Sequence, residues 1–179
     1  MNRCWKLGDN VSTDEILPFQ YMVLTDPSEL GRHILGNVKP GFAERLTRGD
    51  ILVAGLNFGY GSSREHAPLA LRGAGIGAVV AESFARIFFR NCINIGLPAI
   101  VCPAAASGVA EGDSVEIDLR SGEIRNAARN ARYSFAPFPP FLMEYIENGG
   151  LVNTLNKDMN KALNKNLNKT LDNRISTPV

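Results

Sequence analysis

The sequence has almost no net charge, no long apolar run and few cysteines, and each shortage excludes a class of protein. Its 179 residues carry 19 lysines and arginines against 18 aspartates and glutamates, which gives a net charge of +1. Nucleic-acid-binding domains usually carry a clear basic excess, so we expect no nucleic-acid partner. No apolar run approaches the roughly 18 residues of a membrane-spanning helix, so we expect no membrane association.

Targeting and metal-binding signals are also missing. The first residues, Met1 to Lys6, lack the apolar segment of a secretory signal peptide, and we therefore expect a cytoplasmic protein. The three cysteines, Cys4, Cys92 and Cys102, have a spacing that matches no metal motif. Cys92 and Cys102 stand among apolar residues, which predicts buried thiols. We expect no metal site in this chain.

The most informative stretch runs from residue 55 to residue 67 and reads Gly-Leu-Asn-Phe-Gly-Tyr-Gly-Ser-Ser-Arg-Glu-His-Ala. An apolar run at 51–54 precedes it and predicts a buried strand. The glycines allow sharp turns or a close approach to a ligand. Ser62 or Ser63 can cap a following helix that holds Glu65 and His66 in its first turn.

Two interpretations of this loop are open. In the simpler one, the serines only cap a helix. However, a cap needs one such residue, whereas Ser62, Ser63, Arg64, Glu65 and His66 are consecutive. Free N–H groups, hydroxyls and a guanidinium would meet at one place, which favours a site for a carboxylate or phosphate.

Two common phosphate-binding motifs do not fit this loop. No Lys-Ser or Lys-Thr pair follows the glycines, which excludes the Walker loop. Glycines at 55, 59 and 61 do not have the spacing of the dinucleotide fingerprint.

The rest of the chain predicts an α/β fold in one domain. Apolar runs at 51–54, 76–81 and 97–101 alternate with helical segments, among them a helix at 84–92 capped by Ser83, which predicts a parallel β-α-β-α-β layer. A helix is also expected at 28–35, and residues 104–108 look like a linker. Alternating residues near 115–119, 124 and 133–135 predict added antiparallel strands.

The C-terminal segment has a different composition. From residue 154 onward, Asn-Lys pairs recur, and a leucine or methionine returns every four residues from Leu155 to Leu171. We divide the chain into a domain at 1–153 and a low-complexity extension at 154–179. A frayed extension is the favoured interpretation, and a docking helix for a partner or a second copy is the alternative.

Three segments carry a family resemblance. The run from Gly61 to Ala67 resembles the active-site serine loop of the aconitase superfamily. Its flank at 57–59 is most similar to the small subunits of 3-isopropylmalate dehydratase. Residues 8–18 resemble the N-terminal motif of that family, and residues 83–91 resemble its second helix. The resemblance covers about residues 5 to 152 and implies a single swivelling β/β/α domain.

The resemblance also implies residue roles. Ser62 would be the catalytic base, while Ser63 and Arg64 would bind a substrate carboxylate. Thr13 and Asp14 would support the site from a neighbouring loop, and Glu65 and His66 are expected to brace the serine loop. Without the resemblance, Thr13 and Asp14 would be interpreted as a simple hydroxyl or Asx turn.

The segment after Tyr21 would contact the variable arm of the substrate, which makes Val23 and Leu24 candidate substrate-binding residues. Members of the family that act on tricarboxylic homologues tend to carry Arg at position 23 of this numbering. An apolar Val23 suits an alkyl group instead, although Met22 to Leu24 can also be read as core. Tyr60 departs from the family, because many relatives carry Cys there.

The implied function is a hydro-lyase subunit that interconverts 2- and 3-isopropylmalate in leucine biosynthesis. It would need a large subunit carrying a [4Fe-4S] cluster, because this chain lacks the thiolates for one. The small subunit of a homoaconitase or of another alkylmalate dehydratase is the near alternative. A stand-alone anion-binding module is the alternative from a different class.

Overall fold

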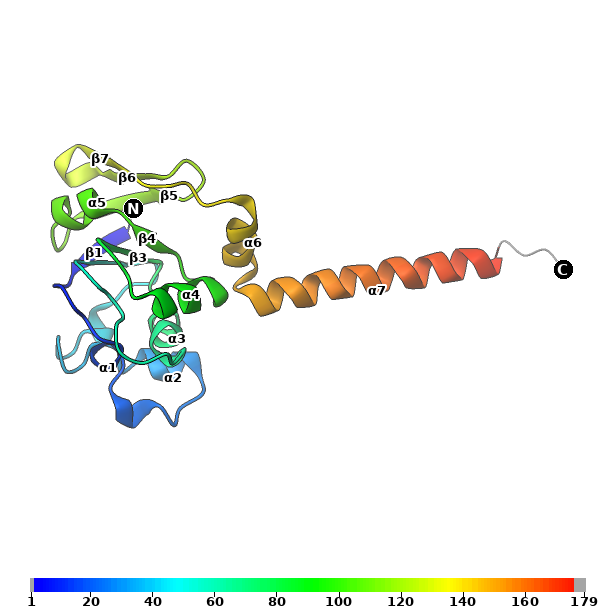
Figure 1. Ribbon diagram of the computed structural model, residues 1–179, viewed down its shortest axis with the longest axis horizontal. Helices are drawn as coiled ribbons and strands as arrows, with labels where there is room; N and C mark the ends of the chain where they lie inside the picture. The colour runs from blue at the N-terminus through cyan, green and yellow to red at the C-terminus, as the bar shows by residue number, and fades with distance from the viewer. Residues whose placement is uncertain (1, 176–179) are drawn as a thin grey trace.

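The protein is built on one mixed sheet of seven strands, in the order β4-β3-β2-β1-β5-β6-β7 (Figure 1). The computed structural model describes the backbone of residues 2–175 and the side chains of residues 2–165. Strand β1 (Asn2–Lys6) joins the two halves, since it pairs parallel with β2 (Ile51–Ala54) and antiparallel with β5 (Ser114–Asp118). The remaining strands are β3 (Ala78–Ala81), β4 (Ala99–Val101), β6 (Glu123–Asn126) and β7 (Ala131–Ser134).

The α/β class, the parallel β-α-β-α-β layer and the added antiparallel strands are confirmed. The helices are α1 (Thr13–Ile16), α2 (Pro27–Gly31), α3 (His66–Gly73), α4 (Arg86–Asn94), α5 (Pro103–Gly108), α6 (Pro140–Asn148) and α7 (Leu151–Ile175), with short 3-10 turns η1 (Phe19–Tyr21), η2 (Ala43–Arg45) and η3 (Ala127–Arg129). Helix α3 links β2 to β3, and α4 links β3 to β4.

Both faces of the parallel half are covered, which explains why β2 and β3 are apolar throughout. Leu52 and Ala54 of β2 point into a core formed with α1 to α4, whereas Ile51 and Val53 point into a second core under α5 and the antiparallel strands. Successive side chains of β2 therefore pack alternately into two cores, one on each face of the sheet. The loop that follows the strand is anchored by packing on both faces.

Two expectations about helices are wrong. The expected helix at 28–35 ends at Gly31. Leu35 is fully buried, has a φ of 53° and donates its N–H to the carbonyl of Ile16, so a contact with α1 replaces the helical bond. The expected linker at 104–108 is helix α5, because its alanines favour helix and Ala105 and Ala106 are buried against the sheet.

The predicted cap at Ser83 is also wrong. Helix α4 begins at Arg86, and its N-cap position is held by Ala85 without a side-chain hydrogen bond. The Ser83 hydroxyl accepts a hydrogen bond from the N–H of Asn57, at 2.8 Å, instead. The Ser83 hydroxyl therefore binds a residue distant in sequence and is not used to cap the helix that follows it.

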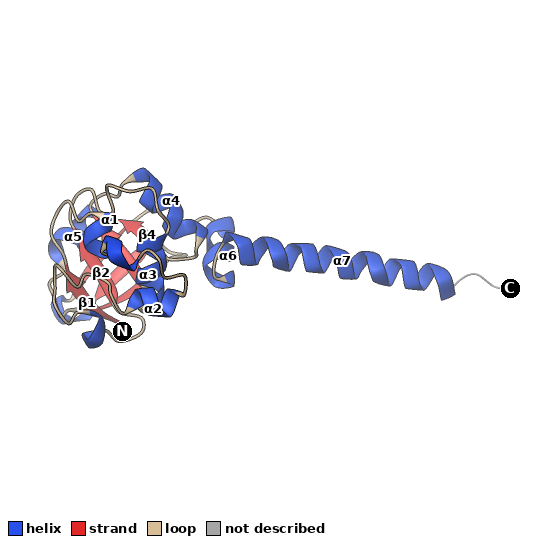
Figure 2. Cartoon of the chain, turned by 90° about the horizontal axis from the view of Figure 1, so that it is seen from below, coloured by secondary structure: helices blue, strands red, loops and turns tan. Residues whose placement is uncertain are grey.

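The C-terminal segment is helical through Ile175, whereas we favoured a frayed extension (Figures 1 and 2). Helix α7 starts at Leu151, where Thr154 is buried and bonds to the carbonyl of Gly150, and it then projects away from the sheet. The side chains of Leu155, Met159 and Leu163 are more than half exposed. The division at residues 153 and 154 stays a prediction.

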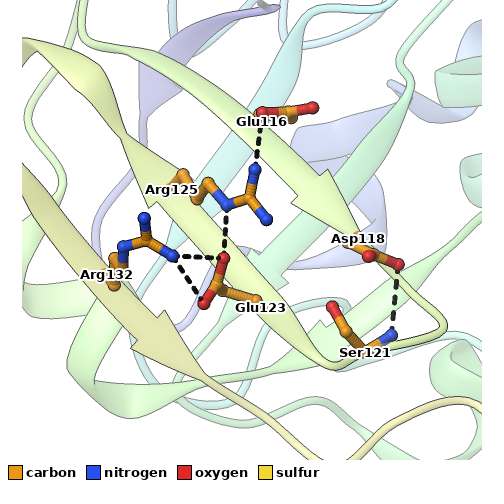
Figure 3. A network of polar contacts seen from close by, with 6 residues as sticks. All are labelled: Glu116, Asp118, Ser121, Glu123, Arg125 and Arg132. Carbon is orange, nitrogen blue, oxygen red and sulfur yellow. Dashed lines mark hydrogen bonds and ion pairs between the residues drawn. The ribbon is translucent and has the colours of Figure 1, made fainter.

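The outer face of the antiparallel half carries a charge network (Figure 3). Arg125 stands opposite both Glu116 and Arg132 in the register of the strands. Glu123 accepts hydrogen bonds from Arg125 and Arg132, which separates the two like charges and lowers the pKa of the Glu123 carboxyl. These exposed pairs order the sheet surface and contribute little to stability.

All three cysteines are buried and free, as predicted for Cys92 and Cys102. Burial raises the pKa of the Cys4 thiol to about 12 and also raises that of Cys92. Within the described part of the chain, no helix combines the length and the apolar character needed to cross a bilayer.

Candidate functional site

The candidate site lies where the loops after β1 and β2 run side by side, at the carboxyl ends of the parallel strands. Backbone hydrogen bonds tie the two loops together. The N–H of Gly59 donates to the carbonyl of Val11 at 2.7 Å, and that of Thr13 donates to the carbonyl of Tyr60 at 2.8 Å. This edge is the usual place for ligands in α/β sheets. The predicted proximity of residues 8–18 to the serine loop follows from this pairing.

Polar side chains strengthen the same junction. The N–H of Leu56 donates to Oδ1 of Asp9 at 2.8 Å, and Nδ2 of Asn57 donates to Oδ1 of Asn10 at 3.2 Å. Both asparagines have left-handed backbones, with φ of 52° and 55°. Asparagine is one of the few residues that tolerate this conformation, so an asparagine at this place in each loop is a sequence signal for the two turns.

Two of the glycines are required where they stand. Gly59 has a φ of 77°, and a Cβ on it would lie inside the ring of Phe88 from α4. Gly61 has a φ of 105°, a conformation that L side chains rarely adopt. Together they turn the chain so that Ser62 lies against Thr13, the first residue of α1.

Ser62 is held at both its backbone and its hydroxyl. Its N–H donates to Oγ1 of the buried Thr13 at 3.0 Å, and its Oγ accepts a hydrogen bond from the N–H of Arg64 at 3.1 Å. The expectation that Ser62 or Ser63 caps helix α3 is wrong. The helix begins at His66, and Glu65 occupies the N-cap position without a side-chain bond.

Ser63 is exposed, and its carbonyl accepts a hydrogen bond from Nδ2 of Asn91 at 3.2 Å. Helix α4 therefore holds the serine loop from a second side. Asn91 was placed on α4 by the sequence, but its contact with the loop was not foreseen, because nothing local signals a partner 28 residues away.

Arg64 reaches across to the segment after α1. Its guanidinium lies over the ring of Phe19, with Cζ 5.3 Å from the ring centroid, and Nη1 contacts the sulfur of Met22. Among the described side chains, no carboxylate forms an ion pair with Arg64. Its positive charge is consequently available for an external anion.

A small surface pocket gathers most of the predicted residues. Its lining is formed by Thr13, Asp14, Leu17, Met22, Ser62, Arg64, His66 and Ala67. Glu65 lies elsewhere, in a hollow beside Arg72 and Asn94. Val23 is 84% exposed and is not part of the core, whereas Leu24 is half-buried against it. The side chain of Tyr60 is not part of the pocket lining.

The arrangement suits an organic anion. A hydroxyl oxygen that accepts an N–H bond lies beside a guanidinium that has no carboxylate partner among the described side chains. The pocket that both residues line has a volume of about 10 Å³, room for about one water molecule, so an organic anion would lie across its exposed rim. Among the residues that the structure describes, no group of three or more His, Cys, Asp or Glu side chains could hold a metal ion.

Comparison with protein families and curated proteins gives concordant results. The model of the aconitase C-terminal domain matches residues 32–105. The 3-isopropylmalate dehydratase small subunit of Moorella thermoacetica is 54% identical over 150 residues, which are 84% of this chain and 90% of that protein. The isopropylmalate/citramalate isomerase small subunit of Methanocaldococcus jannaschii is 51% identical over 157 residues, covering 88% of this chain and 94% of that protein.

A solved structure agrees with these relatives. The crystal structure of 3-isopropylmalate dehydratase from Methanocaldococcus jannaschii superimposes with a TM-score of 0.85 at 42% sequence identity. The match covers 92% of this chain and 97% of that one, so the two chains share one fold over nearly their whole length.

Substitution of Gly59 tests the close approach of the serine loop to α4. We expect Gly59→Ala to lower the free energy of unfolding by roughly 2 to 4 kcal/mol, from a left-handed alanine and from overpacking against Phe88. Gly112→Ala is the matched control, because Gly112 has a φ of 86° and no atom within 4 Å of the added Cβ. Urea denaturation gives both values, and equal losses would contradict the role of Phe88.

Thr13→Val tests the anchor of Ser62. Valine keeps the shape of threonine but removes the acceptor for the Ser62 N–H, so we expect about 1 kcal/mol of destabilisation and faster amide exchange at Ser62. Thr13→Ser keeps the hydroxyl and should preserve the protection. Unchanged exchange in the valine variant would show that this hydrogen bond does not hold the loop.

Proposed function

Because the chain belongs to the family of 3-isopropylmalate dehydratase small subunits, we propose that it is the small subunit of such a hydro-lyase. The observation that carries this proposal is 54% identity over 150 residues, a span that includes most of the chain. The reaction interconverts 2-isopropylmalate and 3-isopropylmalate by loss and return of water, a step of leucine biosynthesis. That the reaction takes place in the cytoplasm stays a prediction from the sequence.

In this proposal Ser62 is the base. Acting as the alkoxide, its Oγ removes a proton from the carbon next to the hydroxyl-bearing carbon and becomes a hydroxyl again. A double bond forms between the two carbons as the C–O bond breaks, and the departing hydroxide takes up a proton from solvent to leave as water. Water then adds back with its hydroxyl on the other of these two carbons. A serine hydroxyl is a very weak acid, so its anion needs stabilisation, and the Arg64 N–H that donates to Ser62 Oγ supplies part of it.

Arg64 and Ser63 hold a substrate carboxylate in this proposal. A guanidinium can grip a carboxylate through two parallel hydrogen bonds, which fixes the orientation of the substrate as well as its position. Ser63 is exposed beside it and adds one hydroxyl donor. Thr13 and Asn91 support the loop, and Asp14 and His66 line the pocket.

The partner is a large subunit, as the names of the relatives imply, and we place a [4Fe-4S] cluster in that subunit. The three cysteines of this chain are buried, and burial raises the thiol pKa of Cys4 and Cys92, which disfavours the thiolate form that binds iron. The cluster would supply a Lewis acid for the departing hydroxyl group. Binding of the partner would also cover the pocket and exclude water.

One experiment tests the subunit role and the base together. The chain is mixed with an anaerobically reconstituted large subunit, and alkene formation from isopropylmalate is followed by absorbance. We expect activity only in the mixture, and Ser62→Ala should lower kcat by about 100- to 10,000-fold. Ser134→Ala, on an exposed strand residue, is the control.

The other outcomes are equally informative. Full activity of Ser62→Ala would remove Ser62 as the base. Association with an intact large subunit but no turnover would shift the assignment to another hydroxy acid. Failure to associate with any candidate large subunit would favour the stand-alone anion-binding module.

The identity of the substrate arm depends on position 23 in this proposal. Val23 is exposed near Arg64 on the segment that carries Met22, where an apolar residue suits an alkyl group. A homoaconitase would need a charge partner for a third carboxylate. An alkylmalate such as citramalate stays an alternative, since one relative is named as an isopropylmalate/citramalate isomerase.

Val23→Arg should therefore shift specificity toward a tricarboxylate. We expect the ratio of kcat/KM for the tricarboxylate to that for isopropylmalate to rise by about 10- to 100-fold, the value of one charge-assisted hydrogen bond. Val23→Leu keeps an apolar side chain and should leave the ratio nearly unchanged. A ratio that does not move in the arginine variant would exclude this position as a specificity determinant.

A further inference from the structure

Phe19 is an exposed aromatic residue that the proposed reaction does not use. It begins the 3-10 turn η1 directly after the buried Pro18, and its side chain is 70% exposed. The turn is fixed at its other end, since the ring of Tyr21 stacks on His33 with centroids 3.7 Å apart and planes 3° from parallel. The ring of Phe19 is therefore presented to solvent from a well-anchored turn.

Among the side chains that the structure describes, Arg64 is the charged group over this ring. Its Cζ lies 5.3 Å from the ring centroid, within the range of a cation–π contact. The sulfur of Met22, at the end of the same turn, contacts Nη1 of the guanidinium. The ring of Phe19 and the sulfur of Met22 thus hold the guanidinium of Arg64 without neutralising its charge. A carboxylate partner would neutralise that charge.

A long arginine side chain loses considerable conformational freedom when it binds a ligand. A platform that already confines the guanidinium at the mouth of the pocket reduces that loss before the ligand arrives. Phe19 and Met22 lie 45 and 42 residues away from Arg64 in the sequence, so this arrangement exists only through the fold.

We propose that Phe19 is a positioning residue for Arg64, and that its ring holds the guanidinium ready for a substrate carboxylate. The inference rests on the proposed function for the identity of the ligand, a hydroxy dicarboxylate. It adds a residue that acts through Arg64 and does not itself touch the reacting atoms. Phe19 also connects the segment that carries Val23 to the serine loop.

The kinetic test uses the assembled two-subunit enzyme. Phe19→Ala should raise the KM for isopropylmalate by about two- to tenfold, the cost of ordering one long side chain when the substrate binds, while kcat changes less than KM. Phe19→Tyr keeps the aromatic face and should restore the KM, whereas Phe19→Leu keeps only the apolar contact and should not. Phe141→Ala removes a comparably exposed ring on α6 and should leave KM unchanged.

A second measurement does not depend on turnover. In the full chain with labelled arginine, the Cδ protons of Arg64 should show an aromatic ring-current shift in NMR spectra. The shift should vanish in Phe19→Ala and persist in Phe19→Tyr. If the wild-type enzyme does not turn over isopropylmalate, the proposed function fails, while this shift still supports the contact. An absent shift, or a KM that is equal in Phe19→Ala and wild type, would overturn the proposal.

Discussion

The site depends on the backbone pairing between the loop after β1 and the loop after β2. Val11, Thr13, Gly59 and Tyr60 exchange main-chain hydrogen bonds, and the hydroxyl of Thr13 then takes the N–H of Ser62. Each loop contains an asparagine in the left-handed conformation, Asn10 in one and Asn57 in the other, and the backbone N–H of each donates to a segment distant in sequence. The two irregular loops thus satisfy each other's backbone N–H and C=O groups, as paired strands do within the sheet.

The sequence predicted the regular parts of this molecule well because their patterns are local. The apolar run at 51–54 coincides with β2, and the apolar run at 76–81 contains β3. The helix caps were predicted less well. Ser62 and Ser83 both have the chemistry of a cap, but neither caps its helix. The Ser62 hydroxyl accepts a hydrogen bond from Arg64 within its own loop, and the Ser83 hydroxyl accepts one from Asn57, which is distant in sequence. A pattern rule cannot see such competition between a local and a distant partner.

Within the site, the sequence identified the chemical groups but not what holds them. The family resemblance predicted that the loop of Thr13 supports the serine loop, and the structure places Thr13, Ser62 and Arg64 in the lining of one pocket, while their chemical roles stay predictions. Phe19 and Asn91 were not found, because an exposed ring or a helical amide has no distinctive local pattern. Their positions become meaningful only when the carbonyl of Ser63 and the guanidinium of Arg64 are seen beside them.

The position of β1 at the joint of the sheet has a consequence for synthesis of the chain on the ribosome. This strand emerges first, yet Asn2 pairs with Val115, which is 113 residues later (115 − 2). At about 5 to 20 residues per second, that partner appears roughly 6 to 23 seconds after β1. Trp5, the one tryptophan of the chain, lies on this strand and is buried in the finished fold. Trp5 packs on Phe42, donates to Asp50 and pairs with Leu52, so the nascent chain can cover its largest apolar side chain once β2 has been made, well before β5 has been made.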